Sequence, residues 1–322
     1  MGRHPHEKSC AKDRALALGR SRPRIRLPVD ILLGISAAFG WGFADFSARF
    51  ATRRIGAFRT LMIMQFFGFA ALTLFLWLTG GFSRTFPHGW IPWLFAVFAG
   101  LLNAISGFCL YRSFEVGLIS IAGPVSSSYP ALTVALALLS GERIHALRAF
   151  GLALTFGGMI LAAITIAPDE AHAVDPQTHH ARAHVSKGAA FAIVASVGYG
   201  FMFWWLGFHV VPFIGSGVSV WVIRITTLTT LLLAGAPAGK VLPLPRGSVW
   251  WLVFVTGLMD TSAFVANNAG LRNGHVAIVS VLGSLYGAVT VLLSRIFLRE
   301  RMERSQWLGI ALIFGGIVLV SL

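Results

Sequence analysis

Ten long apolar runs of about 20 residues follow one another along the chain, and they limit the fold more than any other feature. A helix needs about 20 apolar residues to cross a hydrocarbon core of about 30 Å, where its backbone hydrogen bonds are satisfied internally. The alternating pattern of a membrane β-barrel is absent from these runs. We therefore predict an all-α integral membrane protein with ten transmembrane helices. These are expected at residues 30–50, 58–80, 90–111, 118–139, 146–166, 188–208, 215–234, 248–270, 276–297 and 305–322.

Composition agrees with this class of protein. Of the 322 residues, 56% are hydrophobic and 12% are charged, which is outside the balance of a soluble domain. The net charge of +14 could indicate nucleic acid, but the basic residues gather at the ends of the runs and in the first 29 residues. Such placement favours a signal for membrane orientation over a nucleic-acid surface. With two cysteines, the chain has no disulfide framework and no thiolate metal site.

An internal repeat divides the chain into two halves. The segment Gly40–Phe43 (GWGF) matches Gly198–Phe201 (GYGF) at a spacing of 158 residues, and Tyr129 matches Tyr286 at 157. Because each half holds five helices, an odd number, consecutive halves enter the membrane from opposite sides and form inverted repeats. The expected units are a basic cytoplasmic tail at 1–29, a first five-helix repeat at 30–166, a polar linker with four histidines at 167–187 and a second repeat at 188–322.

Small residues recur every fourth position in several runs, a pattern that lets helix backbones approach closely in lipid. We expect these stripes to pack helices together. They comprise Ser36, Gly40, Ala44 and Ala48, then Ala153 with Gly157, and Ala311 with Gly315.

The stretch Tyr111–Leu161 resembles the fourth and fifth helices of an EamA-type module of the drug/metabolite transporter superfamily, with Pro130 twelve residues before Glu142. Residues 259–319 resemble the second module, although Ala288 replaces the proline. The resemblance implies ten helices, cytoplasmic termini, and transport of amino acids, other metabolites, nucleotide sugars or drugs. It also makes Glu142 and its counterpart Glu300 family markers, which we expect to cap or pair at helix ends.

No motif indicates an enzyme or a cofactor. The phosphate-binding pattern GxxxxGK[ST] is absent, and no nucleophile with a paired base or metal motif lies in a run. The linker histidines His172, His179, His180 and His184 could chelate a metal. Their irregular spacing favours a solvated linker. We therefore predict no cofactor, no metal and no nucleic-acid partner.

The first run carries Asp45, and an ionisable residue within a span is a functional candidate. Asp45 could simply pair with Arg49, four residues further on the same helix face. Alternatively, Asp45 and Trp41, also on this face, project into a central cavity, where the carboxylate binds a substrate amine or a proton.

The second half carries two further ionisable candidates, Arg224 in the seventh run and Asp260 in the eighth. Asp260 aligns with Asn103 of the first half, and Arg224 lies near the equivalent of Gln65. The two could form a structural ion pair. Alternatively, Arg224 binds a substrate carboxylate in a fork and Asp260 binds an ammonium or a proton.

Polar and aromatic residues near these positions complete the candidate site. Asn267 follows Asp260 by two helical turns, and Asn103 with Tyr111 occupies the matching region of the first half. These side chains could line a polar path or hydrogen-bond between helices. Trp41 and Tyr199 are candidates for aromatic cavity walls. The expected substrate-binding residues are thus Trp41, Asp45, Asn103, Tyr111, Tyr199, Arg224, Asp260 and Asn267.

Together these features predict a secondary transporter of the inner membrane. We expect it to export a small amphoteric metabolite, most plausibly an amino acid, by alternating access through a cavity between the halves. A proton-coupled exporter of cations or drugs and a non-transporting scaffold or receptor are the alternatives. Lysine and arginine are nearly balanced on the two faces, so the basic tail and the resemblance together place both termini in the cytoplasm. Because one chain holds both repeats, a monomer suffices.

Overall fold

The computed structural model describes residues 29–82, 89–116, 125–164, 179–235, 247–272, 275–298 and 304–321, and every regular element in these ranges is helical. The elements are α2 (Val29–Ile55), α3 (Ala57–Leu78), α4 (Ile91–Val116), α6 (Pro130–Leu139), α7 (Ala146–Ile164), α9 (His179–Trp205), the π-helix η1 (Leu206–Val210), α10 (Val211–Ile214), α11 (Ser216–Gly235), α12 (Val249–Leu271), α13 (Val276–Gly283), α14 (Tyr286–Leu298) and α15 (Arg304–Ser321).

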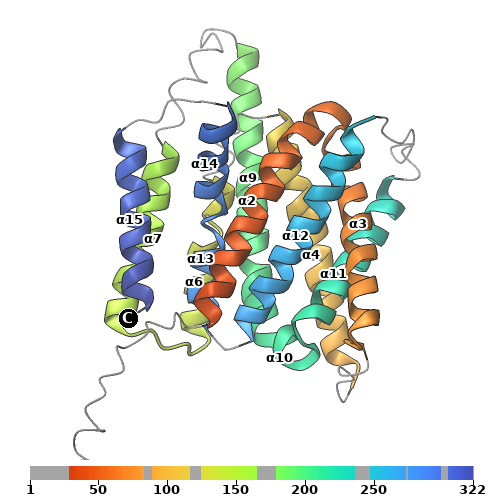
Figure 1. Ribbon diagram of the computed structural model, residues 1–322, viewed down its shortest axis with the longest axis horizontal. Helices are drawn as coiled ribbons and strands as arrows, with labels where there is room; N and C mark the ends of the chain where they lie inside the picture. Colours follow the sequence, from red (N-terminus) through yellow and green to blue (C-terminus); the bar gives the residue numbers. More distant parts are fainter. Residues whose placement is uncertain are drawn as a thin grey trace, which may run out of the picture.

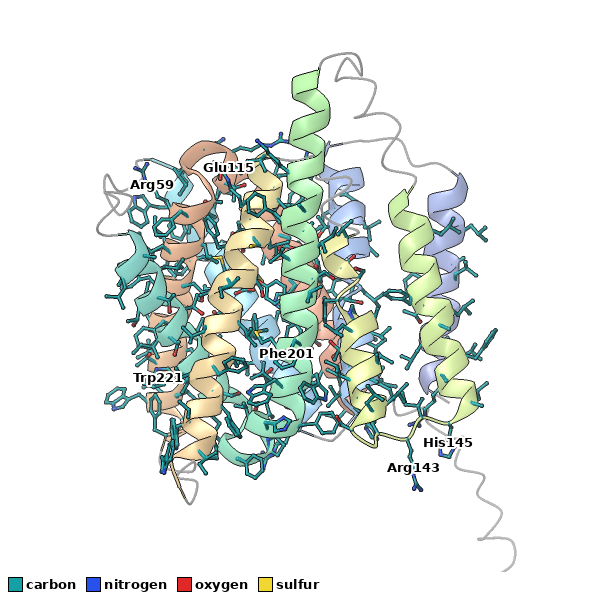
Figure 2. The ribbon with its side chains drawn as sticks, turned by 180° about the vertical axis from the view of Figure 1, so that it is seen from behind. Arg59, Glu115, Arg143, His145, Phe201 and Trp221 are labelled. Atoms are coloured by element: carbon teal, nitrogen blue, oxygen red, sulfur yellow. The ribbon has the colours of Figure 1, made fainter. Side chains whose placement is uncertain are left out.

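Six of the described helices are long and apolar enough to cross a membrane: α2, α3, α4, α9 with its continuation to Ile214, α11 and α12. Shorter apolar helices accompany them. Large apolar side chains cover the outside of the bundle, among them Trp77, Leu233 and Trp251, each more than two-thirds exposed. In Figure 2 the labelled charged residues lie toward the two ends of the bundle, and Phe201 and Trp221 lie between them. This distribution is that of a multi-pass membrane protein.

Several helix boundaries differ from the predicted runs. Helix α2 continues to Ile55, beyond the expected end of the first run. The fourth and ninth expected helices are interrupted, the former at Ser128–Tyr129 just before α6 and the latter at Ser284–Leu285 between α13 and α14. Helix α9 begins at His179, inside the predicted polar linker. The remainder of that linker, 167–178, lies outside the described residues.

The bundle has two ends, named here after residues at each. At the Asp30 end, where α2 begins, Nδ1 of His275 lies 2.6 Å from Oδ2 of Asp30. At the Gly56 end, α2 turns into α3 through Gly56, whose φ of 82° favours glycine. The carboxylate of Glu115 accepts a hydrogen bond of 3.1 Å from the amide of Ala57 there. The Asp30 end is at the bottom of Figure 1 and the Gly56 end at the top.

The two repeats interlock instead of standing side by side. Helix α2, the first of its repeat, packs on α12 of the second repeat, and α9, the first of the second repeat, packs on α4 of the first. Figure 1 shows α2 rising from the Asp30 end and α9 descending toward it. The last helices, α7 and α15, pack against each other at one edge. Residues of both halves therefore meet in the middle of the bundle.

A π-helix explains a change in the repeat spacing. Tyr199 follows Trp41 by 158 residues, whereas Gly215 follows Gly56 by 159 residues. The two glycines are equivalent, because Gly56 precedes α3 with a φ of 82° and Gly215 precedes α11 with a φ of 77°. Between Tyr199 and Gly215 lies the π-helix η1, and a π-turn accommodates one inserted residue. In this register Arg224 is the direct counterpart of Gln65.

Close helix packing occurs at only some of the predicted small-residue stripes. A Cβ placed on Gly40 would lie 2.8 Å from Ala263 Cβ, so α2 and α12 approach closely there. At α7 and α15 the prediction was wrong by one position. Gly157 is exposed, whereas a Cβ on Gly316 would lie 2.6 Å from the carbonyl oxygen of Gly151.

Candidate functional site

A cavity lies between the two repeats, and the space between its lining atoms, open solvent included, is about 500 Å³. Helices α2, α3, α4, α9 and α12 supply most of its wall. The lining residues are Trp41, Asp45, Leu61, Met64, Gln65, Asn103, Leu110, Tyr111, Tyr129, Tyr199, Phe203, Asp260, Phe264 and Tyr286.

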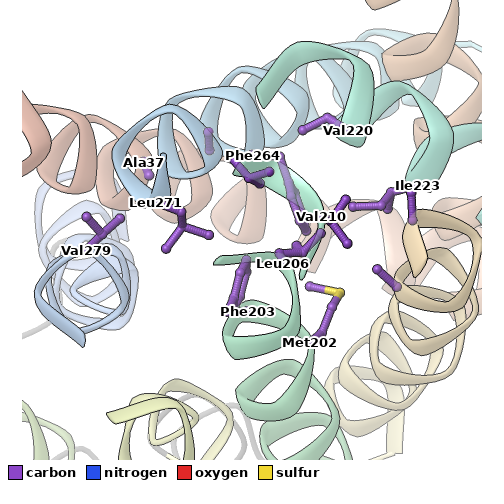
Figure 3. Packing of buried hydrophobic residues seen from close by; sticks show 14 of the residues in the cluster. Ala37, Met202, Phe203, Leu206, Val210, Val220, Ile223, Phe264, Leu271 and Val279 are labelled. Carbon is purple, nitrogen blue, oxygen red and sulfur yellow. The ribbon is translucent and has the colours of Figure 1, made fainter. Parts of the chain in front are cut away.

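The cavity extends from the middle of the bundle toward the Gly56 end. Leu61 and Tyr111 lie close to the ends of α3 and α4 that meet there. On the Asp30 side, closely packed apolar side chains fill the interior, including Leu206, Val210, Leu271 and others labelled in Figure 3. Access to the cavity from the Asp30 end therefore requires movement of this core.

Repeat symmetry organises the middle of the cavity. Eight lining residues form four pairs at the repeat spacing of 157 or 158. The pairs are Trp41 with Tyr199, Asp45 with Phe203, Asn103 with Asp260, and Tyr129 with Tyr286. An inverted repeat places such pairs at the interface of the halves, near the midplane of the bilayer.

Asp45 supplies a carboxyl group that no cation among the described residues neutralises. The side chain lines the cavity, and it has no ion pair or hydrogen bond with any residue that the structure describes. The alternative interpretation, pairing of Asp45 with Arg49, is thus not seen. Burying an unpaired carboxylate is costly, so it takes up either a proton or a cationic ligand.

Arg224 is engaged by other protein groups. It is 0% exposed and does not line the cavity. Its Nη2 lies 2.6 Å from Oδ2 of Asp260, its Nη1 donates a 2.6 Å hydrogen bond to Oε1 of Gln65, and its guanidinium carbon lies 5.0 Å from the centre of the Phe264 ring. Arg224 is therefore held behind the cavity wall, and Asp260 stands between it and the space.

Asn103 and Tyr111 line the cavity but also bind within the protein. Nδ2 of Asn103 donates to Oγ1 of Thr227 at 3.0 Å, and that hydroxyl donates to the carbonyl of Gly100. The Tyr111 hydroxyl donates to Sδ of Met64 at 2.9 Å. The Asn103 contact joins α4 of the first repeat to α11 of the second, and the Tyr111 contact joins α4 to α3 within the first repeat. Both contacts keep these side chains against the wall.

Aromatic rings share the cavity wall with Asp45. The Trp41 ring packs edge-on against Phe264 at 5.3 Å and lies 5.5 Å from Phe203. Tyr129, at 5.1 Å from Phe203, donates to the carbonyl of Ser280. An aromatic wall beside an acidic group attracts cations.

Asn267 is the one predicted site residue besides Arg224 that does not line the cavity. It is fully buried on the Asp30 side of Trp41. Sequence reasoning missed Gln65, Tyr129, Phe203, Phe264 and Tyr286. The exact match of Tyr129 with Tyr286 was a usable signal, whereas the two phenylalanines resemble ordinary core residues.

The described part of the chain contains no group of three histidine, cysteine, aspartate or glutamate side chains close enough to hold a metal ion. The side chains of the linker histidines lie outside the described residues.

Comparison with known proteins supplies the family. The sequence model of the EamA-like transporter family matches residues 29–164 and again 186–322. The chain belongs to this family. It is therefore a membrane transporter of the drug/metabolite transporter superfamily, built from two EamA repeats, and the family is not one of enzymes.

A solved structure described as "Crystal structure of protein" has the same fold as this EamA protein. It is 19% identical, with a TM-score of 0.69, over 90% of this chain and 96% of the other. Among curated proteins the search found no match.

Proposed function

We propose that this EamA protein is a secondary transporter that moves a small amine-bearing solute, binding the amine at Asp45 in exchange for a proton. The observation that carries the proposal is the unpaired carboxyl group of Asp45 in an aromatic cavity. An ammonium group would neutralise the carboxylate and contact the faces of the surrounding rings. A proton would neutralise it when the solute has left.

The charges of the cavity support an amine over an anion. Asp260 is already neutralised by Arg224, so the only carboxyl group left for a ligand among the described lining residues is Asp45. The buried guanidinium is not presented to the cavity, which argues against a first contact with a substrate carboxylate. An organic cation is thus favoured over the amphoteric metabolite expected from sequence.

An amino acid is the second candidate, because Arg224 lies directly behind Asp260. Its Nε has no hydrogen-bond acceptor among the described residues. If Asp260 swings away from Arg224, a substrate carboxylate can take its place on the guanidinium. Amino-acid export would then use Asp45 for the ammonium group and Arg224 for the carboxylate.

The proposal includes ten spans, inverted repeats, cytoplasmic termini and a location in the inner membrane. With that orientation the cavity extends toward the outer face, and an inward proton gradient drives export. A single chain supplies both walls of the cavity, so a monomer suffices.

Counterflow in proteoliposomes tests the substrate class. A panel of labelled organic cations, amino acids and nucleotide sugars is compared for the wild type, Asp45→Asn and the double variant Arg224→Gln/Asp260→Asn. We expect saturable exchange of an amine that Asp45→Asn abolishes and the double variant keeps. Loss of exchange in the double variant favours the amino acid. Glu115→Gln, at the Gly56 end, is the control for a carboxylate outside the cavity.

No exchange with any amine, while a nucleotide sugar or another anion is exchanged, would contradict the proposal.

A further inference from the structure

Two buried amides on the Asp30 side of the cavity are incompletely hydrogen-bonded within the part of the chain that the structure describes. Asn267 is 0% exposed, and neither its Nδ2 nor its Oδ1 has a hydrogen-bond partner among the described residues. Asn268 is also 0% exposed. Its Nδ2 donates to Oγ of Ser219 at 3.0 Å, but its Oδ1 has no described donor. Buried amides are normally paired with protein groups or ordered water, so these groups can still bind a water or a ligand.

Asn267 is immediately next to the cavity wall. The point where a Cβ of Gly283 would lie is 3.1 Å from Oδ1 of Asn267, 3.2 Å from the Trp41 ring and 3.3 Å from the Tyr129 hydroxyl. Trp41 and Tyr129 line the cavity, whereas Asn267 does not. The amide of Asn267, the Trp41 ring and the Tyr129 hydroxyl thus lie around one point, where Gly283 has no side chain.

The repeat relates these amides to residues that line the cavity now. Asn267 and Asn268 are the counterparts of Leu110 and Tyr111 at the spacing of 157 that also relates Asn103 to Asp260. Leu110 and Tyr111 form part of the wall on the Gly56 side.

The same relation holds on the neighbouring helices. Leu61 and Met64 line the cavity, and their counterparts in the register of Gly56 and Gly215 are Val220 and Ile223. Both counterparts are 0% exposed and pack in the core on the Asp30 side (Figure 3). The residues named from the wall on the Gly56 side therefore have counterparts in the second repeat, and all of these counterparts are buried.

The inference rests on the proposed function, because that function requires alternating access. In alternating access the two repeats exchange their roles. We propose that Asn267 and Asn268 form a second binding subsite, which lines the cavity when it faces the Asp30 end and accepts hydrogen bonds from the amine of the solute.

The chemistry of this subsite differs from that of its counterpart. On the Gly56 side, Leu61, Met64 and Leu110 offer no strong hydrogen-bonding group. On the Asp30 side, the two free amide oxygens are acceptors that suit the N–H groups of an ammonium ion. The solute therefore meets two amide oxygens on the Asp30 side, where the counterparts on the Gly56 side offer the single hydroxyl of Tyr111.

Cysteine accessibility tests whether the amides become exposed. Single cysteines replace Asn267, Leu110 or Val253 in a parent that carries Cys10→Ser and Cys109→Ala. A membrane-impermeant methanethiosulfonate is added to right-side-out and to inverted vesicles. Val253 is the matched control, because it is 0% exposed on the same helix, lies outside the apolar core of the Asp30 side, and its counterpart, Ala96, does not line the cavity.

We expect Leu110→Cys and Asn267→Cys to react from opposite sides. If the state open at the Asp30 end is populated to about 0.1–10%, Asn267→Cys reacts about 10- to 1,000-fold more slowly than Leu110→Cys. Val253→Cys should stay unreacted. Asn268→Cys gives an independent reading where Asn267→Cys fails to fold.

Reaction of both positions from the same side, or an Asn267→Cys that reacts no faster than Val253→Cys, would overturn the inference if the parent still exchanges an amine in counterflow. A folded parent that exchanges no amine contradicts the proposed function instead, so the two failures are distinguishable.

Discussion

Removing one member of the Arg224–Asp260 pair should destabilise the protein much more than replacing both members with neutral residues. At about 4 Å between charges and an effective dielectric constant of about 20, their attraction is about 4 kcal/mol. Loss of one partner also leaves the other charge buried, because Arg224 is 0% exposed and the Asp260 side chain is 13% exposed. We expect Arg224→Gln alone to cost about 3–5 kcal/mol.

The double variant Arg224→Gln/Asp260→Asn copies the pair that the first repeat already uses. Their counterparts are Gln65 and Asn103, two neutral residues that line the cavity. Replacing a buried ion pair by neutral groups of similar volume is often close to neutral in free energy. We therefore expect the double variant to recover most of the stability that Arg224→Gln loses.

Thermal unfolding of the purified protein in detergent measures this recovery. At about 2–4 °C per kcal/mol, Arg224→Gln should lower the melting temperature by about 10 °C. The double variant should remain within about 3 °C of the wild type. A loss in the double variant as large as in Arg224→Gln would refute the reasoning, because removing the carboxylate left without its partner would then restore no stability.

Two further predictions concern packing and pH. A Cβ on Gly257 would lie 2.5 Å from the carbonyl oxygen of Met64, so Gly257→Ala should cost about 1–3 kcal/mol in thermal stability. Burial raises the pKa of Glu142, although the amide of Ala277, which donates to it, opposes the rise. Opening the Asp30 end would expose Glu142 and return its pKa toward the ordinary value. The closed state therefore binds the proton of Glu142 more tightly than the open state does. A lower pH should for that reason favour the closed state. Val29 and Leu139 are exposed at that end and can carry spin labels. The distance between the two labels, measured by double electron–electron resonance, reports the closure.

Each of these predictions has a matched control. Gly157→Ala meets nothing within 4 Å and should leave stability unchanged within about 0.5 kcal/mol. An equal effect of the two glycine variants would show that close approach is not the cause. Glu142→Gln should remove the part of the pH response that depends on this carboxyl group. An unchanged response would show that Glu142 is not its source.

The arrangement of the repeats could be predicted from the sequence because the two halves keep matching residues at a nearly constant spacing. The GWGF and GYGF segments and the pair Tyr129–Tyr286 predicted that both halves contribute equivalent residues, and the structure places these tyrosines together in the cavity wall. The rarity of charge in apolar runs likewise singled out Asp45 and Asp260, both of which line the cavity.

Other features depend on geometry that sequence does not show. The π-helix η1 shifts the register by one residue, so the exact counterpart of Arg224 was identified only approximately. Whether Arg224 points into the cavity or into the wall depends on Gln65 and Asp260, which come from different helices. For Asn267, the helical stripe shared with Asp260 gave the correct face but not its position behind Trp41.

The most direct test of the account is accumulation of a labelled amine in proteoliposomes under an imposed pH gradient, compared between the wild type and Asp45→Asn. The account predicts saturable accumulation that follows the gradient in the wild type and is lost in a folded Asp45→Asn. Unchanged, gradient-driven accumulation by Asp45→Asn would contradict it, because the carboxyl group would then carry neither the amine nor the proton.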